Sequence, residues 1–135
     1  KNGGKEKANE YFQKHKLEIY KKPNKIYLAI QNRCSKVGMF ICSKNEFIDW
    51  YSKQVKVCSY CGIPIETIEL IGERTKRLTI DRKDNDKGYS LDNICLACEI
   101  CNHIKSNLFT EVEMKEIAPF VRWRWQGKIK EMVSV

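Results

Sequence analysis

Two Cys-x-x-Cys pairs give this 135-residue sequence its strongest chemical signal. Cys58 and Cys61 form the first pair, Cys98 and Cys101 form the second, and 36 residues lie between the pairs. Four thiolates grouped in this way predict one tetrahedral, structural Zn²⁺ site in a reducing compartment, with disulfides or free thiols as the alternative. Cys95 has the same spacing from Cys98, but a small buried strand residue is the role we expect for it.

Polar residues with chemical potential lie between these pairs and directly after the second one. The candidates are Asp81 and Arg82 at the end of an apolar stretch, Tyr89 after Gly88, Asn93, and Asn102, His103 and Lys105 behind the last cysteine.

This constellation resembles the HNH (ββα-metal) endonuclease family. Within the family it resembles most a subset of restriction and phage enzymes, in which arginine follows the aspartate and a Gly-Tyr pair lies in the loop. The resemblance covers about Phe47 to Met114. It implies a zinc-stapled ββα core and hydrolysis of phosphodiester bonds to 3′-hydroxyl and 5′-phosphate ends.

The resemblance also implies that Asp81 and Asn102 hold a catalytic Mg²⁺ or Mn²⁺. Asp81 would offer a carboxylate from a strand end, and Asn102 an amide oxygen beside the zinc ligand Cys101. Two protein ligands suffice, because Mg²⁺ keeps its waters and takes phosphate oxygens as further ligands. In the alternative interpretation Asp81 pairs with a neighbouring cation and Asn102 caps a helix.

Arg82 stands where most of the family has a histidine that acts as general base. Arginine stays protonated at any working pH, so another group must activate water. The resemblance makes Tyr89 the first candidate, because a divalent ion and Arg82 nearby would favour the ionised phenol. His103 is the second candidate and His15 the third. Arg82 would bind phosphate and stabilise transition-state charge, whereas in the alternative Tyr89 only packs in the loop and His103 is only exposed.

The elements that position these residues follow from periodicity and turn chemistry. We predict strands at 78–82 and 93–97, a polar loop at 83–92 and a helix at 99–107, which together make a ββα unit. Asn93, the family's middle asparagine, would brace the loop through side-chain hydrogen bonds to backbone. The fold class is therefore α+β.

Helices flank this unit on both sides. We predict one at 5–20, one that Asn24 caps and Gly38 follows, and one that begins with a capping box of Ser43 and Glu46. Thr110 and Glu113 form a second capping box, for a helix that stops near Pro119.

The formal net charge of +8 sits entirely in residues 1–57, which hold 13 basic and 5 acidic residues against 12 of each in 58–135. A concentrated basic field favours a polyanion, most commonly nucleic acid, although a solvated basic face is the alternative. We expect the N-terminal helices to dock on double-stranded DNA. Further contacts to DNA are expected from Lys83, Lys105, Arg122 and Arg124, with solvated lysines and an inward-packed tryptophan as the alternative.

We expect one compact domain built from a basic helical segment (1–57), the HNH core (58–114) and a C-terminal helical tail (115–135). No apolar run of about 18 residues exists, so no membrane span is predicted. The expected location is the cytoplasm of a bacterial or phage-infected cell. Since one site cuts one strand, a double-strand break requires a homodimer or two encounters.

The function predicted from the sequence is therefore a metal-dependent DNA endonuclease. Two alternatives stay open: a zinc-stabilised nucleic-acid-binding module without catalysis, and a nuclease effector domain of a larger defence or mobile-element protein.

Overall fold

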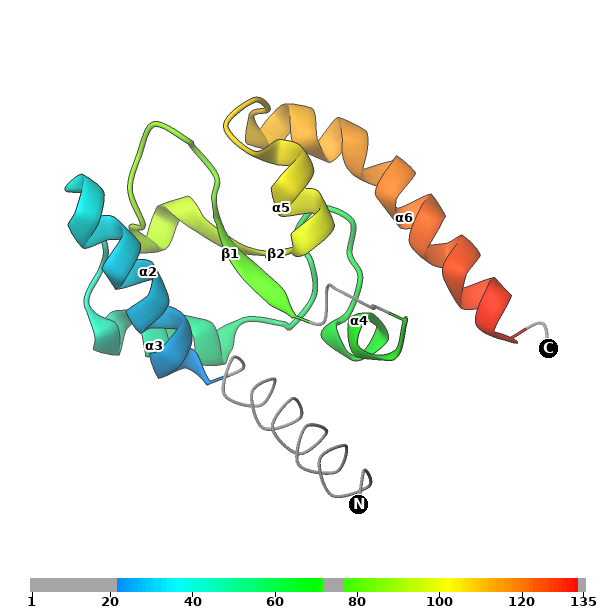
Figure 1. Ribbon diagram of the computed structural model, residues 1–135, viewed down its shortest axis with the longest axis horizontal. Coiled ribbons are helices and arrows are strands. Elements are labelled where there is room, and N and C mark those ends of the chain that lie inside the picture. Colours follow the sequence, from blue (N-terminus) through cyan, green and yellow to red (C-terminus); the bar gives the residue numbers. More distant parts are fainter. Residues whose placement is uncertain (1–21, 72–76, 134–135) are drawn as a thin grey trace, which may run out of the picture.

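A two-stranded antiparallel sheet followed by a short helix lies at the centre of the computed structural model (Figure 1). The structure describes residues 22–71 and 77–133. β1 (Leu78–Arg82) pairs with β2 (Ile94–Cys98), and α5 (Glu99–Lys105) follows without a linker. The predicted ββα order and the α+β class are confirmed. The helix predicted at 5–20, with His15, lies outside the described residues.

The register of the hairpin gives it two chemically different faces. Asp81 lies opposite Cys95 and Thr79 opposite Ala97, so one face carries two polar residues of β1, Thr79 and Asp81. Ile80 lies opposite Leu96 on the other face. All five residues of β2 are buried, which means that the rest of the molecule covers both faces.

The ends of two predicted elements in this unit shift by one or two residues. A 3-10 turn, Leu91–Asn93, precedes β2, so the second strand begins at Ile94 rather than at Asn93. The helix predicted to run to Asn107 ends at Lys105, because Ser106 has a positive φ of 46° and terminates it.

Helices α2 (Pro23–Val37) and α3 (Lys44–Lys53) pack together on one side of the hairpin (Figure 1). Lys22 is the N-cap of α2 and Pro23 occupies its first turn, where a missing N–H costs nothing; the predicted cap at Asn24 is therefore wrong. Gly38 ends α2 in the left-handed conformation, with φ 69°. The capping box of Ser43 and Glu46 begins α3 as predicted.

A short helix, α4 (Ile65–Ile71), follows the first cysteine pair and was not predicted. It is only seven residues long and buries a single side chain, Ile68. So short an amphipathic segment gives almost no periodic signal, and its helical form depends on that one buried contact.

Helix α6 (Glu111–Val133) joins the helix predicted after Thr110 and the predicted helical tail (115–135) into one element. Thr110 and Glu113 form the expected capping box at its start. The helix does not stop near Pro119, which lies inside it. One face, made of Met114, Ala118, Val121 and Trp125, is buried along its length. Burial of this stripe outweighs the hydrogen bond and the steric fit that the proline loses.

A single hydrophobic cluster joins residues of α2, α3, both strands, α5 and α6. Phe47 of α3 lies near its centre, with 1% of its surface exposed and ring contacts to Tyr27, Trp50 and Tyr51. The N-terminal helices therefore share their core with the hairpin. Within residues 22–71 and 77–133, no helix has the length and apolar character needed to cross a bilayer.

Candidate active site

The four paired cysteines converge on one point. Their sulfurs all lie within 4.8 Å of one another, and all four residues are buried. Cys61 Sγ and Cys98 Sγ are 3.8 Å apart, about the separation of two sulfurs that each lie about 2.3 Å from one tetrahedral Zn²⁺. In each pair, the backbone N–H of the second cysteine donates to the sulfur of the first. This donor set fits a closed structural zinc site.

The pKa values of these thiols also indicate a metal site. A hydrogen bond between Cys101 and Cys58 lowers the pKa of Cys58 and raises the pKa of Cys101. Cys98 and Cys101, whose pKa values are raised, therefore keep their protons unless a metal ion replaces them. The other three cysteines are also buried. Cys95 is a buried strand residue, as predicted, and its sulfur lies 3.7 Å from the hydroxyl of Tyr60.

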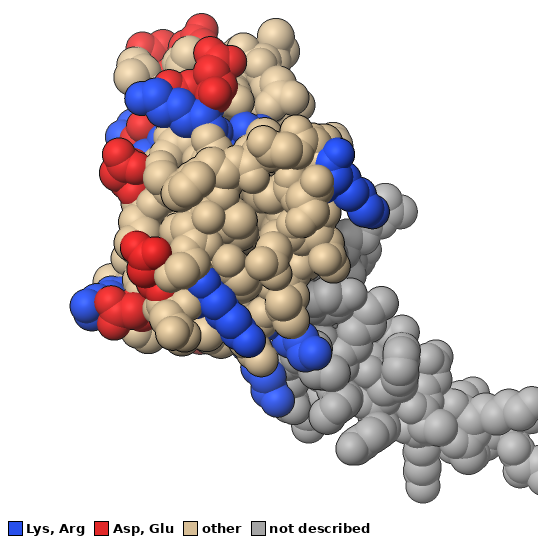
Figure 2. Space-filling model, turned by 90° about the vertical axis from the view of Figure 1, so that its left-hand side faces the viewer, with Lys and Arg blue, Asp and Glu red and all other residues tan. Residues whose placement is uncertain are grey.

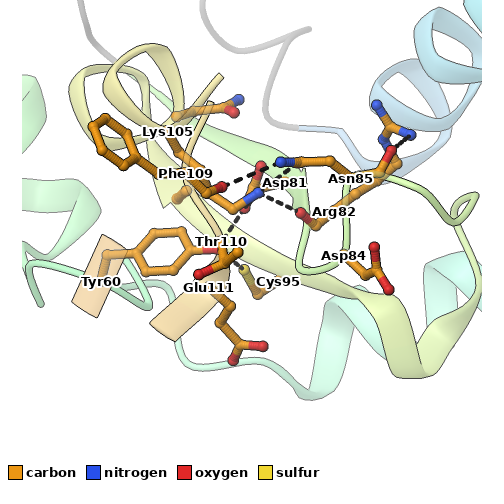
Figure 3. Close-up of polar contacts among 12 residues, drawn as sticks. Tyr60, Asp81, Arg82, Asp84, Asn85, Cys95, Lys105, Phe109, Thr110 and Glu111 are labelled. Atoms are coloured by element: carbon orange, nitrogen blue, oxygen red, sulfur yellow. Dashed lines mark hydrogen bonds and ion pairs between the residues drawn. The ribbon is translucent and has the colours of Figure 1, made fainter. Parts of the chain in front are cut away.

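Asp81 lies in a buried polar cluster together with Tyr60 and Lys105 (Figure 3). The Tyr60 hydroxyl donates to Asp81 Oδ2 over 2.5 Å, and Lys105 Nζ lies 3.4 Å from the same oxygen. Burial raises the pKa of Asp81, while the hydrogen bond from Tyr60 and the charge of Lys105 oppose that shift. Among the described residues nothing donates to Oδ1, and that atom keeps some contact with solvent.

Lys105 is fully buried, with 0% of its surface exposed. Its ammonium donates to the backbone oxygen of Arg82 over 2.8 Å and to Asn85 Oδ1 over 2.7 Å, in addition to its contact with Asp81. A lysine with three internal oxygen partners and no exposed surface has none left for a phosphate. The predicted DNA contact at Lys105 is therefore wrong, and the residue instead joins β1, the loop 83–92 and α5.

Asn102 lies on α5 above the same hairpin face as Asp81. Its Nδ2 donates to Thr79 Oγ1 over 2.8 Å, and Thr79 Oγ1 in turn donates to the backbone oxygen of Ala97 over 2.9 Å. Thr79 and Asp81 are two residues apart, roughly 7 Å along the strand. Among the described residues nothing donates to the amide oxygen of Asn102. Two hard oxygens thus remain for a cation, each on a side chain held through its other polar atom.

Arg82, the last residue of β1, and Tyr89 in the following loop are neighbours. The guanidinium carbon of Arg82 is 5.5 Å from the centre of the Tyr89 ring. Arg82 Nη1 donates to the backbone oxygens of Asn85 and Lys87, over 2.9 and 3.0 Å, and so shapes the loop. Within the described ranges Nε and Nη2 have no protein acceptor, so they can bind an anion.

The position of Tyr89 is fixed through its backbone. Its N–H donates to the oxygen of Phe40 over 2.8 Å, and its oxygen accepts from the N–H of Cys42 over 3.0 Å. Gly88 permits this close approach, because a Cβ there would lie 2.5 Å from the Phe40 oxygen. The loop therefore lies directly against the linker between α2 and α3.

Asn93 braces the loop as predicted. Its Oδ1 accepts from the N–H of Asp84 over 2.9 Å, and its Nδ2 donates to the oxygens of Asp84 and Gly88, over 3.1 and 2.8 Å. The side chain is 5% exposed, so these bonds satisfy a buried amide.

A cavity of about 740 Å³ lies between α2, β1 and α5. Asn102 and His103 line it from α5, and Lys25, Ala29 and Arg33 line it from α2 at successive helical turns. His103, Lys25 and Arg33 are exposed. The apolar floor includes isoleucines of α2, β1 and α5. Asn102, a candidate metal ligand, and the basic residues Lys25 and Arg33 thus line the same cavity.

Figure 2 shows the side of the molecule formed by α2, α3 and the loop, where uncharged side chains fill the centre and both basic and acidic side chains lie around it. Exposed apolar residues of this region include Val37 and Phe40. The basic residues of α2 and α3 therefore do not form one continuous charged face.

The remaining predicted DNA contacts lie apart from one another. Lys83 is half-buried, and its backbone N–H donates to the oxygen of Asn93. Arg122 donates to the backbone oxygens of Cys61 and Tyr60, over 2.8 and 3.5 Å, and so holds the first cysteine pair against α6. Arg124 pairs with Glu131 on the surface. Trp125 packs inward while Trp123 is 71% exposed.

Two residues of the site were missed from the sequence. Tyr60, inside the first cysteine pair, reaches Asp81, and Asn85 accepts from Lys105 and donates to the backbone oxygen of Phe109. A tyrosine between zinc ligands and an asparagine in a polar loop are ordinary residues there. Their roles become visible only when the hairpin and α5 are assembled.

Comparison with known proteins identifies a solved structure that is similar to this chain. No protein-family model and no curated protein matches the sequence. A solved structure of the rare-cutting HNH restriction endonuclease PacI, described for its mechanism of DNA perturbation, superimposes with a TM-score of 0.72. It is 32% identical, and the match covers 79% of this chain and 81% of that chain. With the zinc-ligand cluster and the ββα unit in place, the chain belongs to the HNH endonuclease family.

Proposed function

We propose that this protein is a metal-dependent endonuclease that hydrolyses phosphodiester bonds in double-stranded DNA. The observation that carries the proposal is the pair of free oxygens, Asp81 Oδ1 and Asn102 Oδ1, on one face of the hairpin. Each side chain is held through its other polar atom, by Tyr60 and by Thr79 respectively. Carboxylate and amide oxygens are the ligands that Mg²⁺ and Mn²⁺ take in proteins. A bound ion would polarise the scissile phosphate and stabilise the leaving oxygen.

Arg82 would bind a phosphate oxygen. Its guanidinium is already oriented by two loop carbonyls through Nη1, which leaves a second edge for the substrate. Fixed charge of this kind stabilises the negative charge that develops during hydrolysis. Because Arg82 cannot accept a proton, a different residue must take the proton from the attacking water.

Tyr89 remains the first candidate for that base, since its ring lies beside Arg82 and its backbone is fixed on both sides. His103 is the second candidate, because it lines the same cavity as Asn102. The two make different predictions: removal of the base lowers the rate about 10²- to 10⁴-fold, whereas removal of the other group does not. Tyr89→Phe and His103→Gln, assayed side by side, identify which residue acts.

The cavity wall of α2 would hold the DNA backbone. Lys25 and Arg33 face the cavity that Asn102 lines, and phosphate contacts from such residues position a duplex without reading its sequence. Lys83, Arg122 and Arg124 are further candidates for phosphate contacts, and they lie apart from one another. The double variant Lys25→Glu with Arg33→Glu is expected to bind DNA more weakly, and its affinity is expected to fall less steeply as the salt concentration rises. Lys53→Glu on α3 is the control.

Plasmid nicking tests the proposal directly. Wild-type protein, loaded with zinc, is expected to nick plasmid with Mg²⁺ and to stop with EDTA. Asp81→Asn removes the negative charge of the carboxylate ligand with little change in shape, and Asn102→Ala removes the amide oxygen together with the bond of the amide to Thr79. Asp49→Asn and Asn107→Ala change the same residue types at exposed positions and serve as matched controls. Loss of nicking in the first pair alone supports the assignment.

The alternative of a binding module without catalysis rests on Arg82, which shapes the loop in place of a basic histidine. Zinc-loaded protein that binds DNA but never nicks it, with either Mg²⁺ or Mn²⁺, would establish that alternative. Weak nicking without sequence preference would instead indicate an effector domain that a larger protein or a partner directs.

A further inference from the structure

The segment between the two cysteines of the first pair contributes a side chain to the candidate catalytic site. Tyr60 lies between Cys58 and Cys61, and only 5% of it is exposed. Its hydroxyl reaches across the hairpin edge to the cross-strand pair of Asp81 and Cys95, 2.5 Å from Asp81 Oδ2 and 3.7 Å from Cys95 Sγ.

The backbone around Tyr60 is fixed at several points. The N–H of Ser59 donates to the oxygen of Leu96 on β2 over 2.8 Å, and Arg122 of α6 donates to the oxygens of Tyr60 and Cys61. Zinc bound by the flanking cysteines would add two covalent anchors. The hydroxyl of Tyr60 therefore has one defined position.

That position determines which oxygen of Asp81 is free. Tyr60 and Lys105 both contact Oδ2, and among the described residues no hydrogen-bond donor is directed at Oδ1. Without the hydroxyl, the nearest partner of the carboxylate is the buried Lys105 ammonium, and rotation of the carboxylate could bring both oxygens toward that charge. An ammonium that holds the carboxylate in this way competes with a divalent cation for it.

We propose that Tyr60 is a positioning residue that presents Asp81 to the catalytic metal ion and thereby links the structural zinc site to the affinity for that ion. The inference rests on the proposed function. Partners that orient a metal ligand commonly change metal affinity about 10- to 100-fold when they are removed.

The test uses Tyr60→Phe, which removes one oxygen and keeps the ring. Tyr27→Phe is the matched control, because Tyr27 is also buried and donates its hydroxyl to a backbone oxygen, that of Cys42, over 2.8 Å. Zinc per chain and thermal stability are measured for both variants. Mn²⁺ binding is then followed through the EPR signal of the free ion, in wild type, both tyrosine variants and Asp81→Asn.

We expect Mn²⁺ to bind about 10- to 100-fold more weakly to Tyr60→Phe than to wild type, with full zinc content, while Tyr27→Phe binds normally. Equal Mn²⁺ affinity in Tyr60→Phe and wild type would overturn the positioning role and leave the proposed function intact. Equal weakening in both tyrosine variants would overturn it as well, because the cause would then be general loss of stability.

Wild type that binds Mn²⁺ no better than Asp81→Asn would overturn both the inference and the proposed metal site. A second measurement needs no variant and covers the case in which Tyr60→Phe loses zinc. With ¹³C-labelled tyrosine, addition of Mg²⁺ should shift the Cζ resonance of Tyr60 and leave that of Tyr27 in place. An unmoved Tyr60 resonance at saturating Mg²⁺ would contradict the link.

Discussion

Lys105→Met should be among the most destabilising single substitutions in this protein. The ammonium of Lys105 is fully buried and approaches three oxygens, those of Asp81, the Arg82 backbone and Asn85. Methionine has similar length, so little cavity forms. Stability falls because the buried carboxylate of Asp81 loses its counter-charge, and because the oxygens of Arg82 and Asn85 lose their hydrogen-bond donor.

Breaking a buried ion pair from one side costs about 3–5 kcal/mol. That is a large part of the 5–15 kcal/mol by which folded domains are typically stable. For a chain of this length, it corresponds to a fall in Tm of roughly 10–20 °C. Lys53→Met is the control, because Lys53 pairs with Asp49 on the surface, where both side chains are more than 60% exposed, and such pairs contribute below about 1 kcal/mol.

Urea unfolding at saturating zinc, followed by circular dichroism, measures both variants. The double variant Lys105→Met with Asp81→Asn completes a cycle, and it should cost less than the sum of the two single changes by about 1–3 kcal/mol. A loss below about 1 kcal/mol for Lys105→Met, equal to that of the surface control, would refute the reasoning. The lysine would then be solvated rather than paired.

Three further predictions concern other features of the fold. Pro119→Ala should raise the free energy of unfolding by about 1–3 kcal/mol, because alanine restores a hydrogen bond inside α6 and removes a steric conflict; urea unfolding measures it. Gly88→Ala should destabilise by about 1–3 kcal/mol and slow nicking, since its Cβ would lie 2.5 Å from the Phe40 oxygen and displace Tyr89; unfolding and plasmid assays check both effects. Removal of zinc by a strong chelator should release about one ion per chain and unfold the ββα unit cooperatively, as seen by circular dichroism.

Each of these has a clear contrary result. An unchanged or lower stability of Pro119→Ala would mean that α6 bends at the proline in a way that packing requires. Normal nicking by Gly88→Ala would mean that catalysis does not depend on the position of Tyr89. Retention of the fold without zinc would mean that the hydrophobic cluster alone holds the cysteine pairs together.

Features that depend on local chemistry were predictable from the sequence. The spacing within each cysteine pair, the capping boxes at Ser43 and Thr110, and the order strand, loop, strand, helix all follow from residues close together in the chain. Asn93 was also predictable, because its bonds run to a loop that begins ten residues earlier. The resemblance to the HNH family, which the match to PacI supports at 32% identity, arose from these same residues.

Features that depend on assembly were not predictable in this way. The identity of Lys105 as a lysine suggested solvent or phosphate, but three oxygens from separate segments surround it in the fold. Pro119 by itself predicts the end of a helix, because proline disfavours a helix interior, whereas the stripe from Met114 to Trp125 is buried and keeps the helix intact. In both cases distant residues decide the outcome.

The contact between the loop and the α2–α3 linker has a consequence for recombination among relatives. Tyr89 exchanges backbone hydrogen bonds with Phe40 and Cys42, and Gly88 has no room for a side chain beside Phe40. A chimera that replaces only α2, α3 and their linker would therefore bring a foreign linker against a loop whose shape fits the original one. Exchange of these helices between family members requires that residues 39–42 and 88–89 be inherited together.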